Sequence, residues 1–100
     1  MFIAMNRFKI AKGFEAGFEQ IWRERDSYLT DVPGFESFAL MKGAEADDHV
    51  LYASHTIWAD QQAFTAWTES DSFRKAHAQA SAPKGTYLSH PNLETFAQVV

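Results

Sequence analysis

The order in which two hydrophobic periodicities follow one another is the feature that most restricts the fold of this chain. Residues 2–10 alternate with period two, which predicts a strand with one face made of Phe2, Ala4, Asn6, Phe8 and Ile10. Helical spacing follows over residues 14–29, in Phe14, Phe18, Ile21, Trp22, Arg25 and Leu29. The turn Val32-Pro33-Gly34 ends this helix. The chain therefore begins with a strand and then a helix.

The second part of the chain adds two strands, a broken helix and a last strand. Residues 35–42 and 50–58 are predicted strands, and the acidic loop 43–48 makes them a hairpin with a solvated tip at Asp47-Asp48. Asp60 caps a helix that breaks at Glu69-Ser70-Asp71 and restarts, because short polar side chains favour caps over helix interiors. Residues 81–92 lack periodicity and predict a mobile loop, and residues 93–99 predict the last strand.

The resulting order βαββαβ is the ferredoxin-like pattern, an α+β fold in one domain over residues 1–100. Both helical regions then pack on one face of an antiparallel four-stranded sheet. The other face is predicted to be apolar as well, because the second strand has Phe35, Ala39 and Met41 on one side and Phe38 and Leu40 on the other. A sheet that is apolar on both faces needs a second cover, and we expect a homodimer with sheets packed face to face.

Composition restricts the partners of this domain. Nine basic and 13 acidic residues give a net charge of −4, which argues against nucleic-acid binding. The chain has no cysteine, so disulfides and a cysteine nucleophile are excluded. Asn6, Arg7 and Lys9 interrupt the apolar run that a signal peptide needs, and no stretch is long enough to span a membrane. We expect a soluble, cytoplasmic protein with no membrane partner.

Three residues stand out as candidates for a site. Asn6 lies in the middle of a strand on the helix-facing side, either as a core amide bonded to a loop or as a polar group aimed into a pocket. Trp67 suits core packing. His77 continues an inward-pointing apolar stripe with Phe73, Ala76 and Ala80, where a ligand and a buried histidine without function are equally acceptable interpretations. His49, His55 and His90 have no spacing typical of a metal site.

Taken together, these residues resemble a known family. Asn6-Arg7 in the first strand, followed by the segment WADQQAFTAWTESDSFRKAH over residues 58–77, is similar to the heme-degrading monooxygenases of the antibiotic biosynthesis monooxygenase superfamily, which are dimeric α+β barrels. The resemblance covers nearly the whole chain. In that family an Asn, a Trp and a His form the catalytic set, and here they match Asn6, Trp67 and His77. Trp22 and Arg25 match an aromatic residue and an arginine near the heme more loosely.

The resemblance implies that heme is both cofactor and substrate, and that iron is released when the porphyrin ring is opened with O₂. His77 would be the axial ligand of the heme iron. Asn6 would steer the oxygen through an amide N–H, and Trp67 would bend the macrocycle so that a ring carbon approaches it. Electrons must come from an external reductase or small reductant, because no G-x-G-x-x-G fingerprint of a nicotinamide or flavin site occurs.

Two other functions fit the same residues. The chain could be a cofactor-independent oxygenase acting on a polycyclic aromatic, with Asn6 and Trp67 lining the cavity. It could also be a non-enzymatic heme-binding protein, a carrier or a sensor that holds heme without consuming it.

Overall fold

The computed structural model describes residues 1–24, 28–78 and 82–100 of the chain. Its elements are β1 (Phe2–Ala11), α1 (Glu15–Glu24), β2 (Phe35–Glu45), β3 (His49–Trp58), α2 (Gln61–Thr68), α3 (Asp71–Ala78) and β4 (Asn92–Ala97). The predicted βαββαβ order is therefore confirmed, with the second helical region divided into α2 and α3. The four strands form one antiparallel sheet in the order β2-β3-β1-β4.

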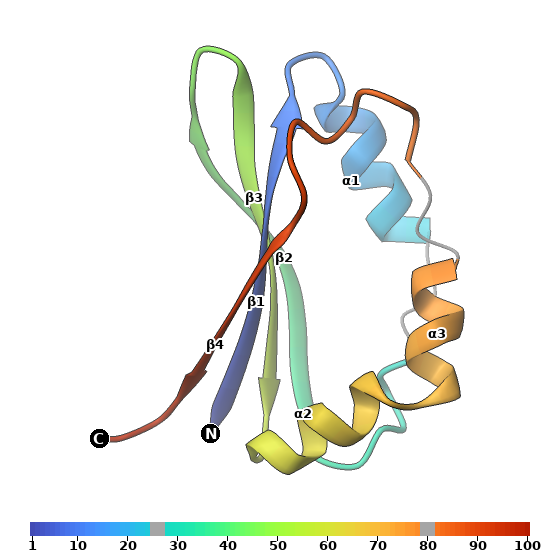
Figure 1. Ribbon diagram of the computed structural model, residues 1–100, viewed down its shortest axis with the longest axis vertical. Coiled ribbons are helices and arrows are strands. Elements are labelled where there is room, and N and C mark those ends of the chain that lie inside the picture. Colours follow the sequence, from blue (N-terminus) through green and yellow to red (C-terminus); the bar gives the residue numbers. More distant parts are fainter. Residues whose placement is uncertain (25–27, 79–81) are drawn as a thin grey trace.

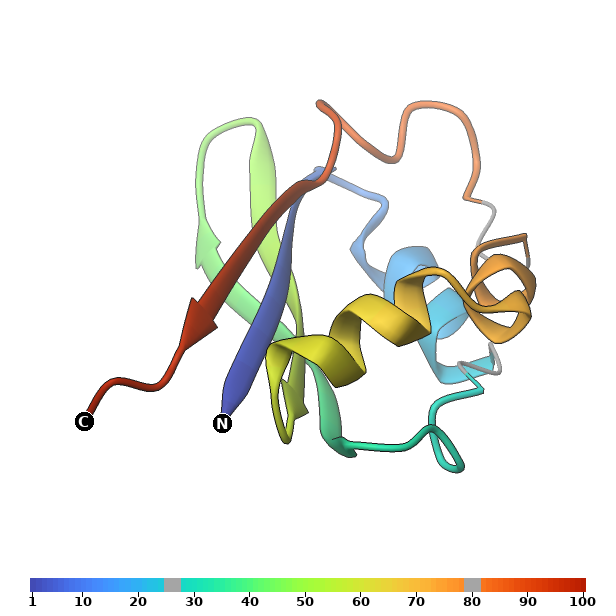
Figure 2. The same cartoon turned by 60° about the horizontal axis from the view of Figure 1, so that its bottom comes forward.

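All three helices lie on one side of the sheet, and its other side has no helix over it in the described part of the chain (Figure 1). The strands cross the helical layer obliquely, and α2 runs beside the lower ends of β1 and β3 (Figure 2). β1 pairs along its length with β3 and over six residues with β4, so it lies inside the sheet. This central position places every second residue of β1 against the helices.

The first helix is shorter than its hydrophobic pattern predicts. It ends at Glu24, whereas the pattern continues to Leu29. Tyr28 has a φ of 57°, a left-handed conformation that no helix interior contains. Leu29 is nevertheless buried, because it packs into the core from the segment that follows the helix. Arg25, predicted on this helix, lies outside the described residues.

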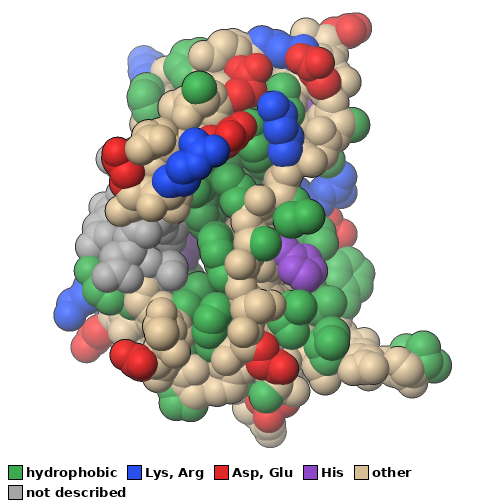
Figure 3. Space-filling model, turned by 180° about the vertical axis from the view of Figure 1, so that it is seen from behind, with side chains coloured by type: hydrophobic (Ala, Val, Ile, Leu, Met, Phe, Trp, Pro, Cys, Tyr) green, Lys and Arg blue, Asp and Glu red, His purple; other side chains and the backbone are tan. Residues whose placement is uncertain are grey.

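The uncovered face of the sheet differs from the prediction at one residue. A register shift between Phe35 and Ser37 turns Phe35 toward the helices, where its ring lies 5.7 Å from that of Trp58. The predicted grouping of Phe35 with Ala39 and Met41 is thus wrong, because period two does not continue through a β-bulge. Ala39 and Met41 do lie on the uncovered face, and Met41 and Phe96 are 56% and 51% exposed. Viewed from behind, hydrophobic side chains lie on both sides of a column of backbone along the middle of the molecule (Figure 3).

The predicted helix break is confirmed in its caps. The carboxylate of Asp60 accepts a hydrogen bond from the backbone N–H of Ala63 at 2.8 Å, which starts α2. The hydroxyl of Ser70 accepts from the N–H of Phe73 at 3.2 Å and donates to the carbonyl of Trp67 at 2.6 Å. Ser70 therefore ends one helix and begins the next, and it fixes the direction in which α3 leaves α2.

The segment before β4, predicted as a mobile loop, makes contacts with the end of β1. Thr86 is 1% exposed, its carbonyl accepts from the N–H of Ala11 at 2.9 Å, and Tyr87 forms a bridge with Ile10. These contacts attach the described part of the segment to the end of β1. Among the described residues, no helix has both the length and the apolar character needed to cross a bilayer.

Candidate functional site

Two clusters of buried side chains lie between the sheet and the helices, with a gap between them. The first cluster, near α1, contains Phe8, Ile10, Phe18, Val50 and Tyr52. The second, near α2, contains Phe2, Leu29, Trp58 and Trp67. Between them the sheet presents the small side chains of Ala4, Ser54 and Thr56. These small side chains leave an unfilled space, whereas the large side chains of the two clusters fill the space between sheet and helices on either side of it.

The gap is centred on Asn6 of β1 and Ser54 of β3, which face each other in the antiparallel register. The other helix-facing side chains of these two strands are all buried: Phe2, Ala4, Phe8, Ile10, Val50, Tyr52, Thr56 and Trp58. On that side of β1 and β3 only Asn6 and Ser54 remain partly exposed. The reason is a cavity of about 140 Å³ that both residues line.

Asn6, Trp67 and His77 all line this one cavity, although they come from β1, α2 and α3. Trp22 of α1 lines it as well, with its ring stacked on that of Phe38 at 5.6 Å and an interplanar angle of 16°. The structure thus brings together every predicted site residue that it describes. Arg25 is the one predicted site residue outside the described ranges.

The other lining residues were not predicted as part of a site, and among them are Phe38, Ser54 and Leu93. Ser54 and Leu93 are the partners of Asn6 on its two neighbouring strands. A small polar residue within a strand that otherwise carries large side chains on its helix-facing side is a signal for such a site. The register that places Ser54 beside Asn6, however, is a tertiary property, and only the structure shows it.

The amide of Asn6 has no hydrogen-bond partner in the described part of the chain. This result argues against the interpretation of Asn6 as a core amide bonded to a loop or a helix end. An asparagine amide can donate two hydrogen bonds and accept two. All of this capacity remains available to a ligand in the cavity.

Trp67 is a rigid wall of the cavity. It is 9% exposed, and its ring lies 5.5 Å from that of Trp58 and 4.8 Å from that of Phe73. Its indole Nε1–H is buried and has no acceptor within the described residues. A buried donor without an acceptor lowers stability, by about 1–3 kcal/mol in typical cases. Trp67 is therefore held by ring packing rather than by a hydrogen bond.

His77 lies at the edge of the cavity, on α3. Its ring centroid is 3.9 Å from that of Phe73 and 6.2 Å from that of Trp67, and its Nδ1 is 2.9 Å from the carbonyl oxygen of Phe73. An Nδ1–H bonded to that carbonyl leaves Nε2 unprotonated and free to bind a metal. This arrangement is typical of histidines that ligate heme iron.

The prediction that His77 is buried in an inward-pointing apolar stripe is wrong. Its side chain is exposed, whereas Ala76 beside it is 0% exposed. The reason is rotational, because neighbouring residues of a helix point about 100° apart and α3 directs Ala76 at the core. Ala80, predicted on the same stripe, lies outside the described residues. His77 thus borders the cavity from its open side.

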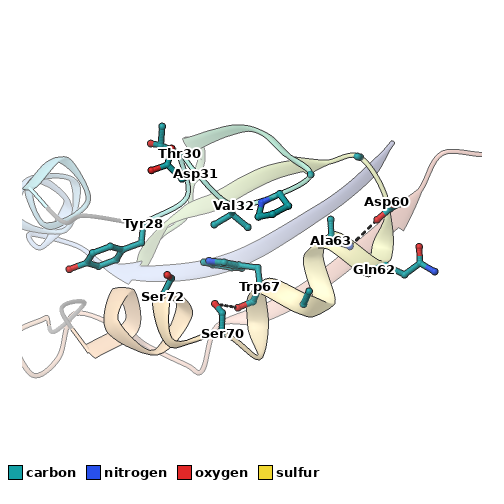
Figure 4. Close-up of a pocket in the computed structure, with 14 residues that line it drawn as sticks. Tyr28, Thr30, Asp31, Val32, Asp60, Gln62, Ala63, Trp67, Ser70 and Ser72 are labelled. Carbon is teal, nitrogen blue, oxygen red and sulfur yellow. Dashed lines mark hydrogen bonds between the residues drawn. The ribbon is translucent and has the colours of Figure 1, made fainter.

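A larger hollow of about 850 Å³ lies elsewhere, between residues 28–34 and the helices α2 and α3 (Figure 4). Of the predicted site residues it contains only Trp67, whose indole lies between the helix and the sheet. Its polar groups are partly in use, since the carboxylate of Asp60 caps α2 and the hydroxyl of Ser70 bonds Trp67. Of the two, the smaller cavity is the candidate site, because it combines Asn6 with His77.

A hydrogen bond between Tyr52 and Glu19 holds α1, and with it Trp22, against the sheet. The hydroxyl of Tyr52 donates to the Glu19 carboxylate at 2.5 Å, and Tyr52 is 1% exposed. This bond lowers the pKa of Glu19, because it stabilises the charged carboxylate. Burial, together with the bond to Glu19, raises the pKa of Tyr52. At neutral pH the pair is therefore a neutral donor and a charged acceptor.

The chemistry of the lining residues is suited to a heme, but the volume of the cavity is too small to hold one. An imidazole with a free Nε2 can bind heme iron, and an amide and aromatic walls can form the surrounding pocket. A volume of about 140 Å³ is below the roughly 300–1,000 Å³ of sites for drug-sized ligands. Entry of a tetrapyrrole must therefore widen the cavity. Phe38 and Leu93, 37% and 55% exposed, border it at the outer strands β2 and β4.

The comparisons with known proteins identify the family. A family model described as antibiotic biosynthesis monooxygenase matches residues 1–79. The chain is 32% identical over 76 residues to the staphylobilin-producing heme oxygenase 1 of Staphylococcus aureus (strain Newman), a match that covers 76% of this chain and 70% of that protein. The chain therefore belongs to the antibiotic biosynthesis monooxygenase family, as its sequence predicted.

Solved structures agree with this fold. The heme-degrader MhuD from Mycobacterium tuberculosis, with two hemes bound in its active site, superposes with a TM-score of 0.77 at 23% identity, over 100% of this chain and 97% of that chain. SnoaB, a cofactor-independent oxygenase from Streptomyces nogalater, superposes with a TM-score of 0.65 at 20% identity, over 97% and 92% of the two chains. These likenesses confirm the predicted α+β architecture.

Proposed function

We propose that this protein is a heme-degrading monooxygenase, which binds heme as cofactor and substrate and uses O₂ and external electrons to open the porphyrin ring and release iron. One observation carries the proposal: Asn6, Trp67 and His77, far apart in the sequence, line a single cavity. The heme oxygenase of S. aureus, which is similar over most of the chain, supports it.

His77 is the residue that would hold the heme iron. Its Nε2 is free and its Nδ1 contacts the carbonyl of Phe73, so the ring orientation is fixed in advance. Bound heme would supply the iron for reaction with O₂ and the porphyrin carbon that becomes oxidised. The exposure of His77 places the ligand at the open side of the cavity, where a large planar molecule can reach it.

Asn6 and Trp67 would control the geometry inside the cavity. An amide N–H is a donor that does not titrate, so Asn6 can orient an oxygen-bearing ligand without transferring a proton to it. Trp67 is fixed by Trp58 and Phe73, so a bound ring has to adapt to the indole rather than displace it. A wall of this rigidity can bend a macrocycle and bring one ring carbon closer to the oxygen.

We further propose that the protein is a homodimer that buries the uncovered sheet face. The apolar residues on that face are Ile3, Met5, Ala39, Met41, Leu51, Ala53, Ile57 and Phe96. Water contact with such an area is unfavourable, and a second copy of the same face is its simplest cover. An external reductase or small reductant would be the second partner.

A cofactor-independent oxygenase is the second candidate, favoured by the likeness of the fold to SnoaB. In that case the cavity would hold a polycyclic aromatic between Trp22, Phe38 and Trp67, and His77 would not bind a metal. A heme carrier or sensor is the third.

A hemin titration followed by addition of ascorbate in air separates the three functions. The proposed function predicts a shifted Soret band on binding and its decay after the reductant is added. A Soret band that shifts and then persists would identify a carrier or a sensor. No shift at all would favour the cofactor-independent oxygenase.

A further inference from the structure

Ser54 occupies a position that the stability of the fold does not explain. It lies in the middle of β3 on the helix-facing side, between Tyr52 and Thr56, which are both buried. Its hydroxyl has no hydrogen-bond partner in the described part of the chain. Serine is a poor strand former compared with valine or threonine. A larger apolar residue would fill the gap in the core, so a serine at this position indicates a role other than packing.

Thr56, two residues further along the same face, shows the contrast. Its hydroxyl donates to the carbonyl of Ala4 at 3.2 Å and is 2.9 Å from the indole Nε1 of Trp58, which donates to it. Thr56 is therefore fully engaged in holding the sheet and the core together. Ser54 faces the same cavity with its hydrogen-bonding capacity unused.

The neighbour of Ser54 across the sheet is Asn6. Side chains that face each other in an antiparallel pair have Cβ atoms about 4.5–5.5 Å apart. The hydroxyl and the amide can therefore reach the same small ligand. On the outer strands the same row continues with Leu40 and Leu93, which are apolar. The polar side chains of this row are thus Asn6 and Ser54, and the hydroxyl of Thr56 beside them is already engaged.

We propose that Ser54 is a second hydrogen-bond donor, which acts beside Asn6 on the same acceptor ligand at the cavity floor. This inference rests on the proposed function, because it assigns a residue of the same site. The amide of Asn6 can present either its N–H or its carbonyl oxygen to a ligand. If the Ser54 hydroxyl donates to the ligand or to the amide oxygen, the orientation in which the amide N–H points at the ligand is favoured. An oxygen or nitrogen atom with two lone pairs can receive both bonds.

The test compares Ser54→Thr with Ser54→Val, two side chains of nearly the same shape, of which only threonine keeps the hydroxyl. The hemin-loaded proteins are titrated with sodium azide, which accepts hydrogen bonds and is not consumed. We expect Ser54→Thr to bind azide within about twofold of wild type, and Ser54→Val roughly two- to tenfold more weakly, the range of one neutral hydrogen bond. Hemin affinity and melting temperature should be similar in the two variants.

Ser54→Ala removes the hydroxyl without adding bulk and covers the case in which the larger side chains disturb heme binding. It should weaken azide binding as Ser54→Val does. Ser37→Ala makes the same change on the uncovered face of β2 and should leave azide affinity at the wild-type value. The double variant Asn6→Ala with Ser54→Val should lose less than the product of the two single losses, because both residues act on one ligand.

The outcomes are distinct. Equal azide affinity in the Thr and Val variants, or wild-type affinity in Ser54→Ala, would overturn the donor role of Ser54. A wild-type protein that binds hemin without degrading it would overturn the proposed function alone, since the azide comparison still reports on Ser54. A wild-type protein that fails to bind hemin would overturn both.

Discussion

At the residue scale, the core of this protein has polar groups at the point where tight packing would favour apolar ones. Asn6 and Ser54 interrupt two buried strand faces, and the Nε1–H of Trp67 is buried without an acceptor among the described residues. The buried Nε1–H of Trp67 without an acceptor is unfavourable for folding. Polar groups that do not serve packing and surround one cavity are typical of a site shaped for a ligand.

Replacement of Asn6 tests whether its amide serves folding or a ligand. Because the amide has no protein partner in the described part of the chain, Asn6→Ala should leave the melting temperature nearly unchanged. The variant should still bind hemin through His77. Decay of the Soret band under ascorbate and air should slow by about 10²–10³, the usual loss for one preorganised donor. Asn92→Ala, on the uncovered side of β4, is the matched control and should degrade heme at the wild-type rate.

Removal of the imidazole tests the metal ligand. His77→Ala should lose most of its hemin affinity, and its remaining heme should be extracted easily by apomyoglobin. Its melting temperature should stay close to that of wild type, since His77 is exposed and outside both core clusters. His90→Ala, an exposed histidine that does not line the cavity, should behave as wild type. An unchanged heme spectrum in His77→Ala would mean that another residue is the ligand.

The Tyr52–Glu19 bond predicts a dependence of stability on pH. The folded state lowers the pKa of Glu19, so this carboxylate stabilises the fold above its unfolded pKa of about 4.3 and loses that contribution as the pH falls through the lower folded value. Glu19→Gln and Tyr52→Phe should both melt below wild type at pH 7. The difference should shrink once the pH is low enough to protonate Glu19 in both states. A gap that stays constant down to pH 2 would show that the charge of Glu19 is not involved.

At the element scale, the junction of α2 and α3 decides where His77 lies. The side chain of Ser70 links the end of α2 to the start of α3, since its hydroxyl bonds the carbonyl of Trp67 and the N–H of Phe73. Trp67 and His77 belong to different helices, and this junction sets the distance between them. A change at Ser70 should therefore alter both the stability of the fold and the binding of heme.

Two cap variants separate these effects. Ser70→Ala and Asp60→Ala should each lower the free energy of unfolding by about 0.5–2 kcal/mol, because each removes an N-cap. Only Ser70→Ala should also weaken hemin binding, because Asp60 caps the far end of α2. Urea unfolding and hemin titration of both variants provide the measurements. Equal hemin affinities would show that α3 keeps its direction without the serine.

At the scale of the whole molecule, the sheet has one covered and one uncovered face, and the uncovered face should form a dimer. Light scattering of the wild type should give twice the chain mass of 11.3 kDa at micromolar concentration. Ile57→Lys places a charge on the uncovered face of β3 and should shift the protein toward the monomer. Gln62→Lys, an exposed position on α2, adds the same charge and should remain dimeric. A monomeric wild type would contradict the proposed assembly.

The order of elements followed from the sequence alone, because each periodicity is a local property of neighbouring residues. The alternation over residues 2–10, the cap at Asp60, the helix break at residues 69–71, and the family resemblance of Asn6, Trp67 and His77 could all be read from the chain. The end of the first helix and the orientation of the first residue of β2 could not be predicted in this way. The helix that begins at Glu15 does not extend to Leu29, because the backbone at Tyr28 is left-handed, and Phe35 turns inward through a bulge; neither conformation has a periodic signal.

The site itself was decided by the tertiary structure. Strand register places Ser54 beside Asn6, and register depends on the pairing of residues 48 positions apart in the chain, which hydrophobic patterns do not encode at single-residue resolution. The rotation of α3 likewise decides that Ala76 is buried and His77 lies at the edge of the cavity. The sequence by itself determined which residue types are present and in which elements. The cavity arises only because the folded sheet brings the small side chains of Ala4, Ser54 and Thr56 together between two clusters of large ones.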